Sequence, residues 1–430
     1  MKSDLHKVLH PIAGRPMLAH LLAAVESLSP AEKVVVVGSG REQVEPLVRD
    51  HGGIVVVQDP QLGTAHAVLQ ARESLAAFTG DVLILYGDTP LVSAATMRRM
   101  VARLNAPDAP AAVVVASRPD DPLTYGRIIA GPDGTIVKMV EHKDASDEER
   151  AVNLCNSGLM AVRSEDLWPL LERVGNANAA GEYYLPDIVM LPGAQSVVIE
   201  AESWEVAGVN SRAELAGVEA DWQDRRRMEA MRDGVTLVAP ETVYFAYDTV
   251  LGRDVRVEPN VVFGPGVNVA DDVTIRAFSH LEGASICAGA EVGPYARLRP
   301  GAKIGPKAKV GNFVEVKKSE LGEGAKVNHL SYIGDAVIGP GANIGAGTIT
   351  CNYDGFFKYR TEIGAGAFIG SNSALVAPVK IGDGAIVAAG SVVTKEVDAD
   401  ALCLVRPVQE GKPGWAKRFR ARMQARKAAK

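Results

Sequence analysis

The sequence is poor in aromatic residues and in cysteine, and it contains no long apolar run. Only 5% of its 430 residues are Phe, Trp or Tyr. The four cysteines lack the paired spacing of a zinc site and the density of a disulfide framework, which favours a reducing compartment. No signal-peptide pattern and no stretch of about 18 apolar residues is found. We therefore expect a cytoplasmic protein without membrane insertion.

Charge and length narrow the choice further. The net charge of −6 argues against nucleic acid as a partner, although segment 415–430 is strongly basic. We interpret that tail as a solvated helix, and an anion-binding arm is the alternative. A chain of 430 residues exceeds the size at which one core keeps growing. Because its 43 glycines lie mostly in the second half, we expect two domains of different architecture.

Residues 1–210 alternate short apolar runs with amphipathic stretches, as α/β domains do. Continuous apolar runs are typical of buried parallel strands, so we predict a mostly parallel, Rossmann-like sheet covered by helices. One helix is expected over residues 16–28, and a polar linker helix over residues 211–233. The expected strands are Val34–Val37, Ile54–Val57, Val82–Tyr86, Ala112–Ala116, Ile136–Val140, Leu159–Val162 and Val197–Ile199.

From about residue 251 the apolar period becomes six. Aliphatic residues recur at every sixth position, often followed by glycine, as in Ile333-Gly334. This hexapeptide repeat predicts a parallel β-helix over residues 234–410, with aliphatic side chains inside the prism and small residues at its corners. On the order of eight coils are expected. The basic tail then covers residues 411–430.

The hexad phase breaks once, between Thr350 and Ile363. The intervening residues have to leave the coil as a loop, and loops that project from a rigid solenoid often carry function. This loop holds Asn, Tyr, Asp and Lys side chains within residues 352–358.

Polar residues in the first half are candidates for a phosphate site. Asp88 follows an expected strand, where ligands of open α/β sheets bind and where a carboxylate can hold Mg²⁺, whereas a turn cap is the alternative. Thr64 follows Leu62-Gly63 at an expected helix start and suits either a ligand or a helix cap. Lys7 suits either a phosphate or an ordinary surface position.

In the second half, His329 lies where the hexads lack their usual glycine. A histidine there can take a proton near neutral pH, and a hydrogen-bonded corner residue is the alternative. Arg299 and Lys317 lie within about one coil of it along the prism, so they suit a sugar phosphate or decorate an outer face.

Taken in order, these segments resemble the bacterial bifunctional N-acetylglucosamine-1-phosphate uridylyltransferase / glucosamine-1-phosphate N-acetyltransferase family over nearly the whole chain. The blocks that carry the resemblance are Leu62-Gly63-Thr64, Tyr86-Gly87-Asp88, Tyr125-Gly126-Arg127-Ile128, Glu141-His142-Lys143-Asp144, Gly181-Glu182-Tyr183-Tyr184, Gly208-Val209-Asn210 and residues 343–355. The resemblance implies a left-handed β-helix and a homotrimer with acetyltransferase sites between neighbouring prisms. It also implies a role in UDP-N-acetylglucosamine synthesis for peptidoglycan and lipopolysaccharide.

For acetyl transfer, the resemblance implies that His329 is the general base that deprotonates glucosamine 1-phosphate before its amine attacks acetyl-CoA. The residues that match the sugar-phosphate site are Arg299, Lys317, Tyr332, Asn343 and Glu315. The residues that match acetyl-CoA positions are Ala346, Asn352, Tyr353, Ser371, Ala389 and Arg406.

For uridylyl transfer, the resemblance implies attack of N-acetylglucosamine 1-phosphate on the α-phosphorus of UTP, with Mg²⁺ held by Asp88 and Asn210. The other residues that match UTP or sugar positions are Lys7, Gln58, Gly63, Thr64, Tyr86, Gly87, Gly126, Glu141 and Asn156. The family opens with an apolar strand and a glycine-rich loop upstream of the segment that matches residues 3–7. Since the sequence begins at the last residue of that motif, and His6 replaces a usual proline, we expect acetyl transfer to be retained and uridylyl transfer to be weak.

Three other interpretations remain open at this point. The first is a nucleotidyltransferase for another sugar with a purely structural β-helix, the second is a monofunctional acetyltransferase, and the third is an inactive trimeric scaffold. His329 and the block 343–355 argue against the first, because a structural prism does not need them. The intact His329, Arg299, Lys317 and Tyr353 argue against the last.

Overall fold

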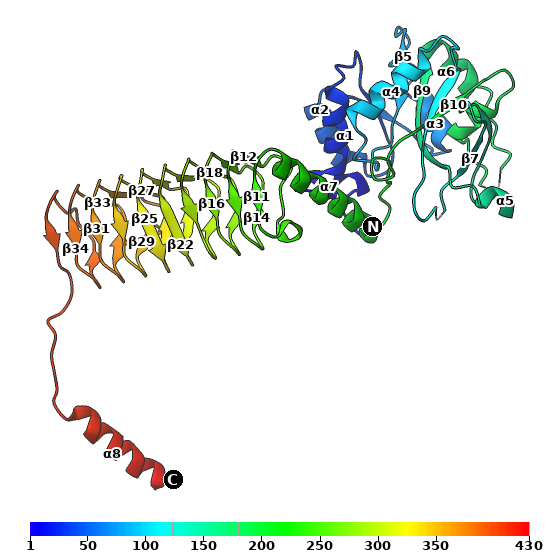
Figure 1. The fold of residues 1–430 in the computed structure, drawn as a ribbon. Coiled ribbons are helices and arrows are strands. Elements are labelled where there is room, and N and C mark those ends of the chain that lie inside the picture. The colour runs from blue at the N-terminus through cyan, green and yellow to red at the C-terminus, as the bar shows by residue number, and fades with distance from the viewer. Residues whose placement is uncertain (123, 179, 430) are drawn as a thin grey trace. The chain divides into compact units, whose positions relative to one another are not determined.

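The computed structural model describes residues 1–122, 124–178 and 180–429, and it divides into two compact units, Met1–Met228 and Glu229–Lys430. The first unit mixes helices and strands, whereas the second is a β-helix (Figure 1). No helix among these residues is long and apolar enough to cross a membrane.

The helices of the first unit are mostly short. They are η1 (Lys7–Leu9), α1 (Met17–Glu26), α2 (Arg41–Asp50), α3 (Thr64–Leu69), α4 (Ala94–Leu104), α5 (Asp147–Arg150), α6 (Ser164–Leu171), η2 (Leu185–Met190) and α7 (Arg212–Arg232), which continues into the second unit. Its strands are β1 (Pro11–Ile12), β2 (Arg15–Pro16), β3 (Val34–Val37), β4 (Ile54–Val57), β5 (Asp81–Ile84), β6 (Ala112–Ser117), β7 (Arg127–Ala130), β8 (Ile136–Val140), β9 (Cys155–Arg163) and β10 (Val197–Glu200).

The main sheet of this unit is mixed. Its order is β10-β6-β9-β7-β8, and β5 also pairs with β9. Strand β6 runs parallel to β10, but β9 runs antiparallel to β5, β6 and β7. The sequence prediction of a mostly parallel sheet missed β7, which forms a hairpin with β8 around a turn at Gly131–Gly134. Strands joined by so short a turn have to be antiparallel, because a parallel crossover needs a dozen or more residues.

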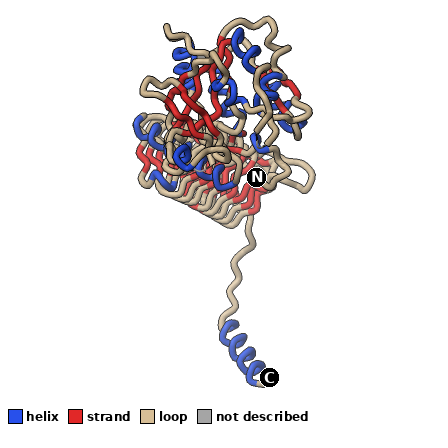
Figure 2. The backbone as a smooth tube through the Cα atoms, turned by 90° about the vertical axis from the view of Figure 1, so that its right-hand side faces the viewer, coloured by secondary structure: helices blue, strands red, loops and turns tan. Residues whose placement is uncertain are grey.

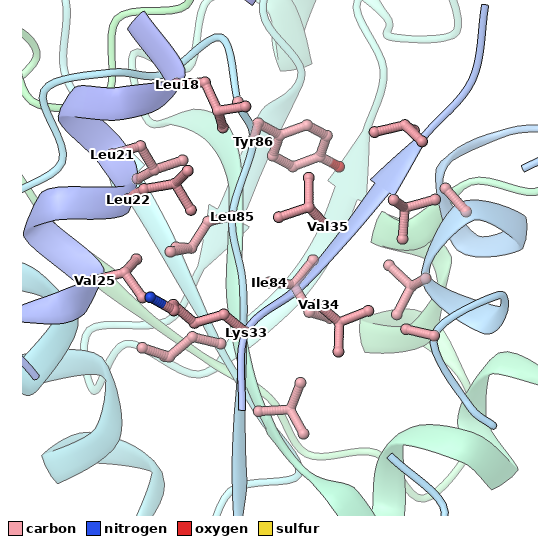
Figure 3. A pocket seen from close by; sticks show the side chains of 18 of the residues that line it. Leu18, Leu21, Leu22, Val25, Lys33, Val34, Val35, Ile84, Leu85 and Tyr86 are labelled. Carbon is pink, nitrogen blue, oxygen red and sulfur yellow. The ribbon is translucent and has the colours of Figure 1, made fainter. Parts of the chain in front are cut away.

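A second, two-stranded parallel sheet pairs β3 with β4 and is separate from the main sheet. An apolar cavity of about 810 Å³ is lined by residues of both β3 and β5 (Figure 3). Its lining includes Val34 and Val35 of β3, Leu85 beyond the end of β5, and Leu18 and Leu22 of α1.

The second unit consists of coils whose strands stack into three parallel sheets (Figures 1 and 2). The first sheet contains β11 (Thr236–Leu237), β13 (Arg256–Val257), β16 (Thr274–Ile275), β19 (Glu291–Val292), β22 (Lys309–Asn312), β25 (Lys326–His329), β28 (Asn343–Ile344), β31 (Phe368–Ile369), β34 (Ile386–Val387) and β36 (Leu402–Cys403). The second contains β12 (Val250–Leu251), β15 (Asn268–Val269), β18 (Ala284–Ile286), β21 (Ala302–Ile304), β24 (Glu320–Leu321), β27 (Ala336–Ile338), β30 (Thr361–Ile363) and β33 (Val379–Ile381). The third contains β14 (Val262–Phe263), β17 (His280–Leu281), β20 (Arg297–Leu298), β23 (Glu315–Lys317), β26 (Tyr332–Gly334), β29 (Ile349–Cys351), β32 (Ala374–Val376) and β35 (Val392–Val393).

The hexad pattern explains the core of this unit. In most of these short strands one residue faces outward and the next, an aliphatic residue, is buried, as side chains alternate along a strand. Phe245 and Phe263 add a stacked pair with ring centroids 5.2 Å apart. Polar outer and apolar inner residues therefore repeat from coil to coil. Two of the three sheets contain eight strands, one from each coil, as expected from the length of the repeat region.

The predicted break in the hexads is a projecting loop between β29 and β30. A lone bridge between Tyr353 and Lys358 closes it. The short helix η3 (Pro240–Thr242) precedes the first complete coils. In the basic tail, α8 (Trp415–Ala428) has almost entirely exposed side chains, and Lys430 lies outside the described residues.

Candidate functional site

In the first unit, Lys7 joins two oxygen donors from distant parts of the sequence. Its Nζ donates to Asp88 Oδ2 at 2.6 Å and to Asn210 Oδ1 at 2.8 Å. Asp88 follows β5 by four residues, and its carbonyl accepts a hydrogen bond from Val209 N, which holds the segment before Asn210 in place. The three side chains predicted to bind phosphate and metal thus meet at one point.

The chemistry of this point suits Mg²⁺. This ion prefers carboxylate and amide oxygens, and it keeps few protein ligands when it binds a nucleotide. Asp88 and Asn210 supply one oxygen each, and both oxygens are already turned toward a positive charge, the ammonium of Lys7. Asp88 and Asn210 would hold such an ion, and Lys7 would supply a further positive charge for the phosphates.

A second group of predicted residues surrounds Tyr86. Burial raises the pKa of Tyr86 to about 12, and its hydroxyl hydrogen-bonds to the Thr64 side chain. Gly63 has φ +118°, and a Cβ there would lie 2.5 Å from the Tyr183 carbonyl oxygen, so only glycine fits. Gln58, which is buried, donates from Nε2 to the Gly63 carbonyl at 2.9 Å. These residues form one connected wall.

A third group lies at the ends of β7, β8 and β9. Asn156 N donates to the Gly126 carbonyl at 2.9 Å, and a Cβ on Gly126 would lie 3.4 Å from a Glu141 carboxylate oxygen. Burial raises the pKa of Glu141, and the charges of Asp144 and Asp187 add to the effect. Gly87 precedes Asp88, and a Cβ there would lie 3.4 Å from Val8 and 3.5 Å from Leu18. All predicted residues of this unit therefore fall into three small groups. The negative charges of Asp88 and Glu141 both contribute to the raised pKa of Tyr86.

In the second unit, four of the six predicted acetyl-CoA residues line up along one corner of the prism, and the other two, Asn352 and Tyr353, lie at the projecting loop. Backbone hydrogen bonds connect successive coils from Gly347 N to the His329 carbonyl, from Asn372 N to the Ala346 carbonyl and from Gly390 N to the Ser371 carbonyl. The Arg406 guanidinium then donates to the Ala389 carbonyl at 2.6 Å. The column thus runs from the predicted base to the predicted phosphate-binding arginine, and its members are His329, Ala346, Ser371, Ala389 and Arg406.

Of the five predicted sugar-phosphate residues, Asn343 lies on β28 of the first sheet, and the other four lie on or directly after strands of the adjoining third sheet. Glu315 pairs in register with Tyr332 on the next coil, and its carboxylate accepts a hydrogen bond from Arg299 Nη1 at 2.7 Å. His329 precedes Tyr332 by only three residues, so the base stands beside this group. Asn343 lies opposite Lys326 on the neighbouring coil, at the start of the strand that ends at His329.

Lys358 joins this face from the projecting loop. The nearby ammonium of Lys358 lowers the pKa of Lys317, and the positive charge of Arg299 lowers it further. Three cationic side chains therefore lie close together, and one of them, Arg299, also pairs with the Glu315 carboxylate. Like charges gathered in this way favour an anion, and a phosphate dianion fits them. The sequence alone did not assign Lys358 to the site, because Lys317, the cation beside it in the fold, lies 41 residues away along the chain.

The projecting loop is braced by hydrogen bonds of its own. Asp354 Oδ1 accepts the amides of Phe356 and Phe357 at 2.8 and 2.7 Å. Asn352 is buried and donates to Asp335 Oδ2 at 2.5 Å, whereas the neighbouring Tyr353 is exposed. The loop therefore has one side chain anchored in the prism and one available to a ligand.

Asn312, which was not predicted from the sequence, also contacts the site. Its Oδ1 lies 2.6 Å from His329 Nδ1, on the coil below. Only the register between coils identifies it, because 17 residues separate the two.

Comparisons with known proteins agree with this architecture. A family profile described as a MobA-like NTP transferase domain matches residues 1–152, and a profile of six bacterial transferase hexapeptide repeats matches residues 360–395. Fold and site together define a nucleotidyltransferase unit followed by a hexapeptide-repeat transferase unit, and the coils are those of a left-handed β-helix.

Relatives named "Bifunctional protein GlmU" extend over the whole chain. Those of Rhizorhabdus wittichii, Sphingopyxis alaskensis and Zymomonas mobilis are 68%, 64% and 60% identical. The matches cover 100%, 100% and 98% of this chain and 96%, 95% and 95% of the relatives. The chain belongs to the GlmU family of bifunctional proteins, which is the family that its motifs resemble.

Proposed function

We propose that the chain is a bifunctional enzyme of UDP-N-acetylglucosamine synthesis. Its β-helix unit transfers an acetyl group from acetyl-CoA to glucosamine 1-phosphate, and its first unit transfers uridylyl from UTP to N-acetylglucosamine 1-phosphate with Mg²⁺. The observation that carries the proposal is the prism corner on which His329 and four of the predicted acetyl-CoA residues form one column, beside a cationic face.

Acetyl transfer needs a free amine. His329 takes a proton from the ammonium of glucosamine 1-phosphate, and the amine attacks the acetyl carbonyl carbon. The C–S bond then breaks, the amide forms, and coenzyme A leaves and is protonated to the thiol. Arg299, Lys317 and Lys358 neutralise the sugar phosphate, so that the amine is directed toward the corner column that holds acetyl-CoA.

Uridylyl transfer joins two phosphates. A phosphate oxygen of N-acetylglucosamine 1-phosphate attacks the α-phosphorus of UTP, and pyrophosphate leaves. Bound Mg²⁺ supplies charge neutralisation at the phosphates, and Asp88 and Asn210 are the residues that would hold it. Lys7 contributes a second positive charge, while the wall formed by Gln58, Thr64 and Tyr86 orients the substrates. The expectation that this activity is weak stays a prediction.

We also propose that the enzyme is a cytoplasmic homotrimer. Exposed aromatic residues form a ladder along one prism corner, where Phe278 stacks on Tyr295 and Tyr295 on Phe313 with centroids 4.8 and 5.1 Å apart. Large apolar side chains exposed in a row are typical of subunit interfaces. The four cysteines are free, in keeping with a reducing compartment.

Two assays on the purified chain test the proposal. Thiol release from acetyl-CoA is expected to require glucosamine 1-phosphate, and pyrophosphate release from UTP is expected to require N-acetylglucosamine 1-phosphate and Mg²⁺. Thiol release that is equally fast with another amino sugar phosphate would contradict the assigned substrate. The absence of any sugar-dependent thiol release would reject the acetyltransferase.

A further inference from the structure

The imidazole of His329 is exposed at the prism corner, but the coils on either side hold its residue firmly. Its backbone carbonyl accepts hydrogen bonds from Gly347 N at 3.3 Å and from the Ser331 hydroxyl at 2.8 Å. The next residue, Leu330, donates its amide to the Asn312 carbonyl at 3.0 Å. The backbone is thus fixed, while the ring is free to rotate unless a side chain holds it.

That side chain is Asn312. It is half-buried on the coil below, directly opposite His329 in the strand register, and its Oδ1 lies 2.6 Å from the imidazole Nδ1. A carboxamide oxygen can only accept a hydrogen bond, so Nδ1 has to donate. The neutral ring then carries its proton on Nδ1, and the lone pair remains on Nε2.

We propose that Asn312 is a positioning residue for acetyl transfer, one that orients the His329 ring and selects the tautomer in which Nε2 is the free base. This inference rests on the proposed function, in which His329 is the general base. Asn312 acts through the histidine and needs no contact with the substrate. The carboxamide is neutral, so it fixes the tautomer without the added attraction for a proton that a carboxylate would bring.

The surroundings of the pair make the effect measurable. On the two strands that carry the pair, the other titratable residues are two lysines. Lys309 lies three residues before Asn312 on β22, and Lys326 lies three residues before His329 on β25. From the coil above, β28 contributes Asn343 and Ile344, followed by the backbone of Gly347, none of which titrates. A carboxylate placed at position 312 would therefore be a new negative charge next to the imidazole.

Asn312→Ala and Asn312→Asp form the test, with Asn268→Ala and Asn268→Asp as matched controls at an exposed strand position three coils away. Asn312→Ala removes the acceptor, and we expect kcat for acetyl transfer to fall about 10-fold to 100-fold with little change in KM, less than removal of the base itself. Asn312→Asp keeps the acceptor, so kcat at its optimal pH should stay within about threefold. Its negative charge favours the imidazolium, so the acid limb of the pH–rate profile should move up by about one unit.

Each outcome decides the inference. A normal kcat in Asn312→Ala would overturn it. If Asn312→Asp loses as much activity as Asn312→Ala while its circular dichroism stays normal, the carboxamide donates to Nδ1 and the proposed tautomer is wrong. Should Asn312→Ala fail to fold, the pH profile of Asn312→Asp still decides, because a merely structural asparagine would leave it unmoved. The variant His329→Ala distinguishes a failure of this inference from a failure of the proposed function. If His329→Ala is active, His329 is not the general base. If His329→Ala is inactive but the Asn312 variants are normal, only the role of Asn312 is rejected.

Discussion

The two units solve the same problem, the burial of an apolar core, in opposite ways. In the β-helix, strands such as β13, β16 and β19 pair with the coil before and the coil after, and the inward valines and isoleucines are almost fully buried. In the first unit, the sheet is divided, β3 and β4 stand apart from β9, and an apolar cavity borders both β3 and β5 (Figure 3).

The difference shows how contact range affects robustness. A coil needs only its neighbours, so the packing of the prism depends on contacts close in sequence. The α/β unit depends on strands brought together from distant segments, and Val35 and Leu85, which border its cavity, are only partly buried. The two candidate sites differ in the same way. The residues of the acetyltransferase column lie on adjacent coils, whereas Lys7 contacts Asn210 from 203 residues away in the sequence.

The largest expected effect is on acetyl transfer alone. His329→Ala should lower the rate of thiol release about 10²-fold to 10⁴-fold, because it removes the general base. The side chain is exposed, so the fold should be unchanged. Circular dichroism and UTP binding by calorimetry serve as controls. A variant that keeps more than about a tenth of the activity would contradict the assignment, and altered UTP binding would show that the units are not independent.

Matched Val→Ala substitutions, one in each unit, test the comparison of the two cores. Val267 is fully buried in the prism, so Val267→Ala should cost about 2 kcal/mol of stability. Val35 is half-buried and borders the cavity, and Val35→Ala should cost less than about 1 kcal/mol because fewer contacts are lost. Hydrogen exchange read separately for β15 and β3 measures both. Equal costs would mean that the cavity is closed in solution.

The acetyltransferase site is expected to have separate residues for acetyl-CoA and for glucosamine 1-phosphate. Arg406 ends the corner column and Tyr353 lies exposed on the projecting loop. Each alanine variant should raise KM for acetyl-CoA about tenfold and change KM for glucosamine 1-phosphate much less, because both residues are predicted to contact the coenzyme. Steady-state kinetics with each substrate varied in turn gives the answer. Equal effects on both constants would refute this division of the site.

The smallest expected effect concerns the brace of the loop. Asp354→Ala removes the acceptor for two loop amides and should loosen Lys358, raising KM for glucosamine 1-phosphate about threefold. Asp354→Asn keeps an acceptor and should behave like the wild type. Hydrogen bonds hold the pKa of Asp354 below its usual range, so the brace is complete above that range and is lost as pH falls through the lowered value. Identical kinetics for the two variants would remove the loop from the site.

Much of the fold was predictable because it repeats. The sixfold period predicted the β-helix and its projecting loop, and continuous valine runs predicted β3 and β4 with the observed bounds. The prediction failed where an element has no strong local signal: β7 is a short strand that pairs in a hairpin, and β5 ends at Ile84, two residues before the predicted end. Tyr86, the last residue of the predicted strand, lies beyond its observed end, and its hydroxyl hydrogen-bonds to the Thr64 side chain.

By itself, the sequence determined the fold class, the family and the residue types at each predicted site position, because these depend on local patterns and motifs. Only the tertiary structure decided which side chains meet. Coils are not all of equal length, since Glu315 lies 18 residues after its partner Arg297 but 17 before Tyr332. The register that sets Asn312 against His329, or Lys358 beside Lys317, follows from how each corner turns, and corner geometry depends on packing against the coils above and below.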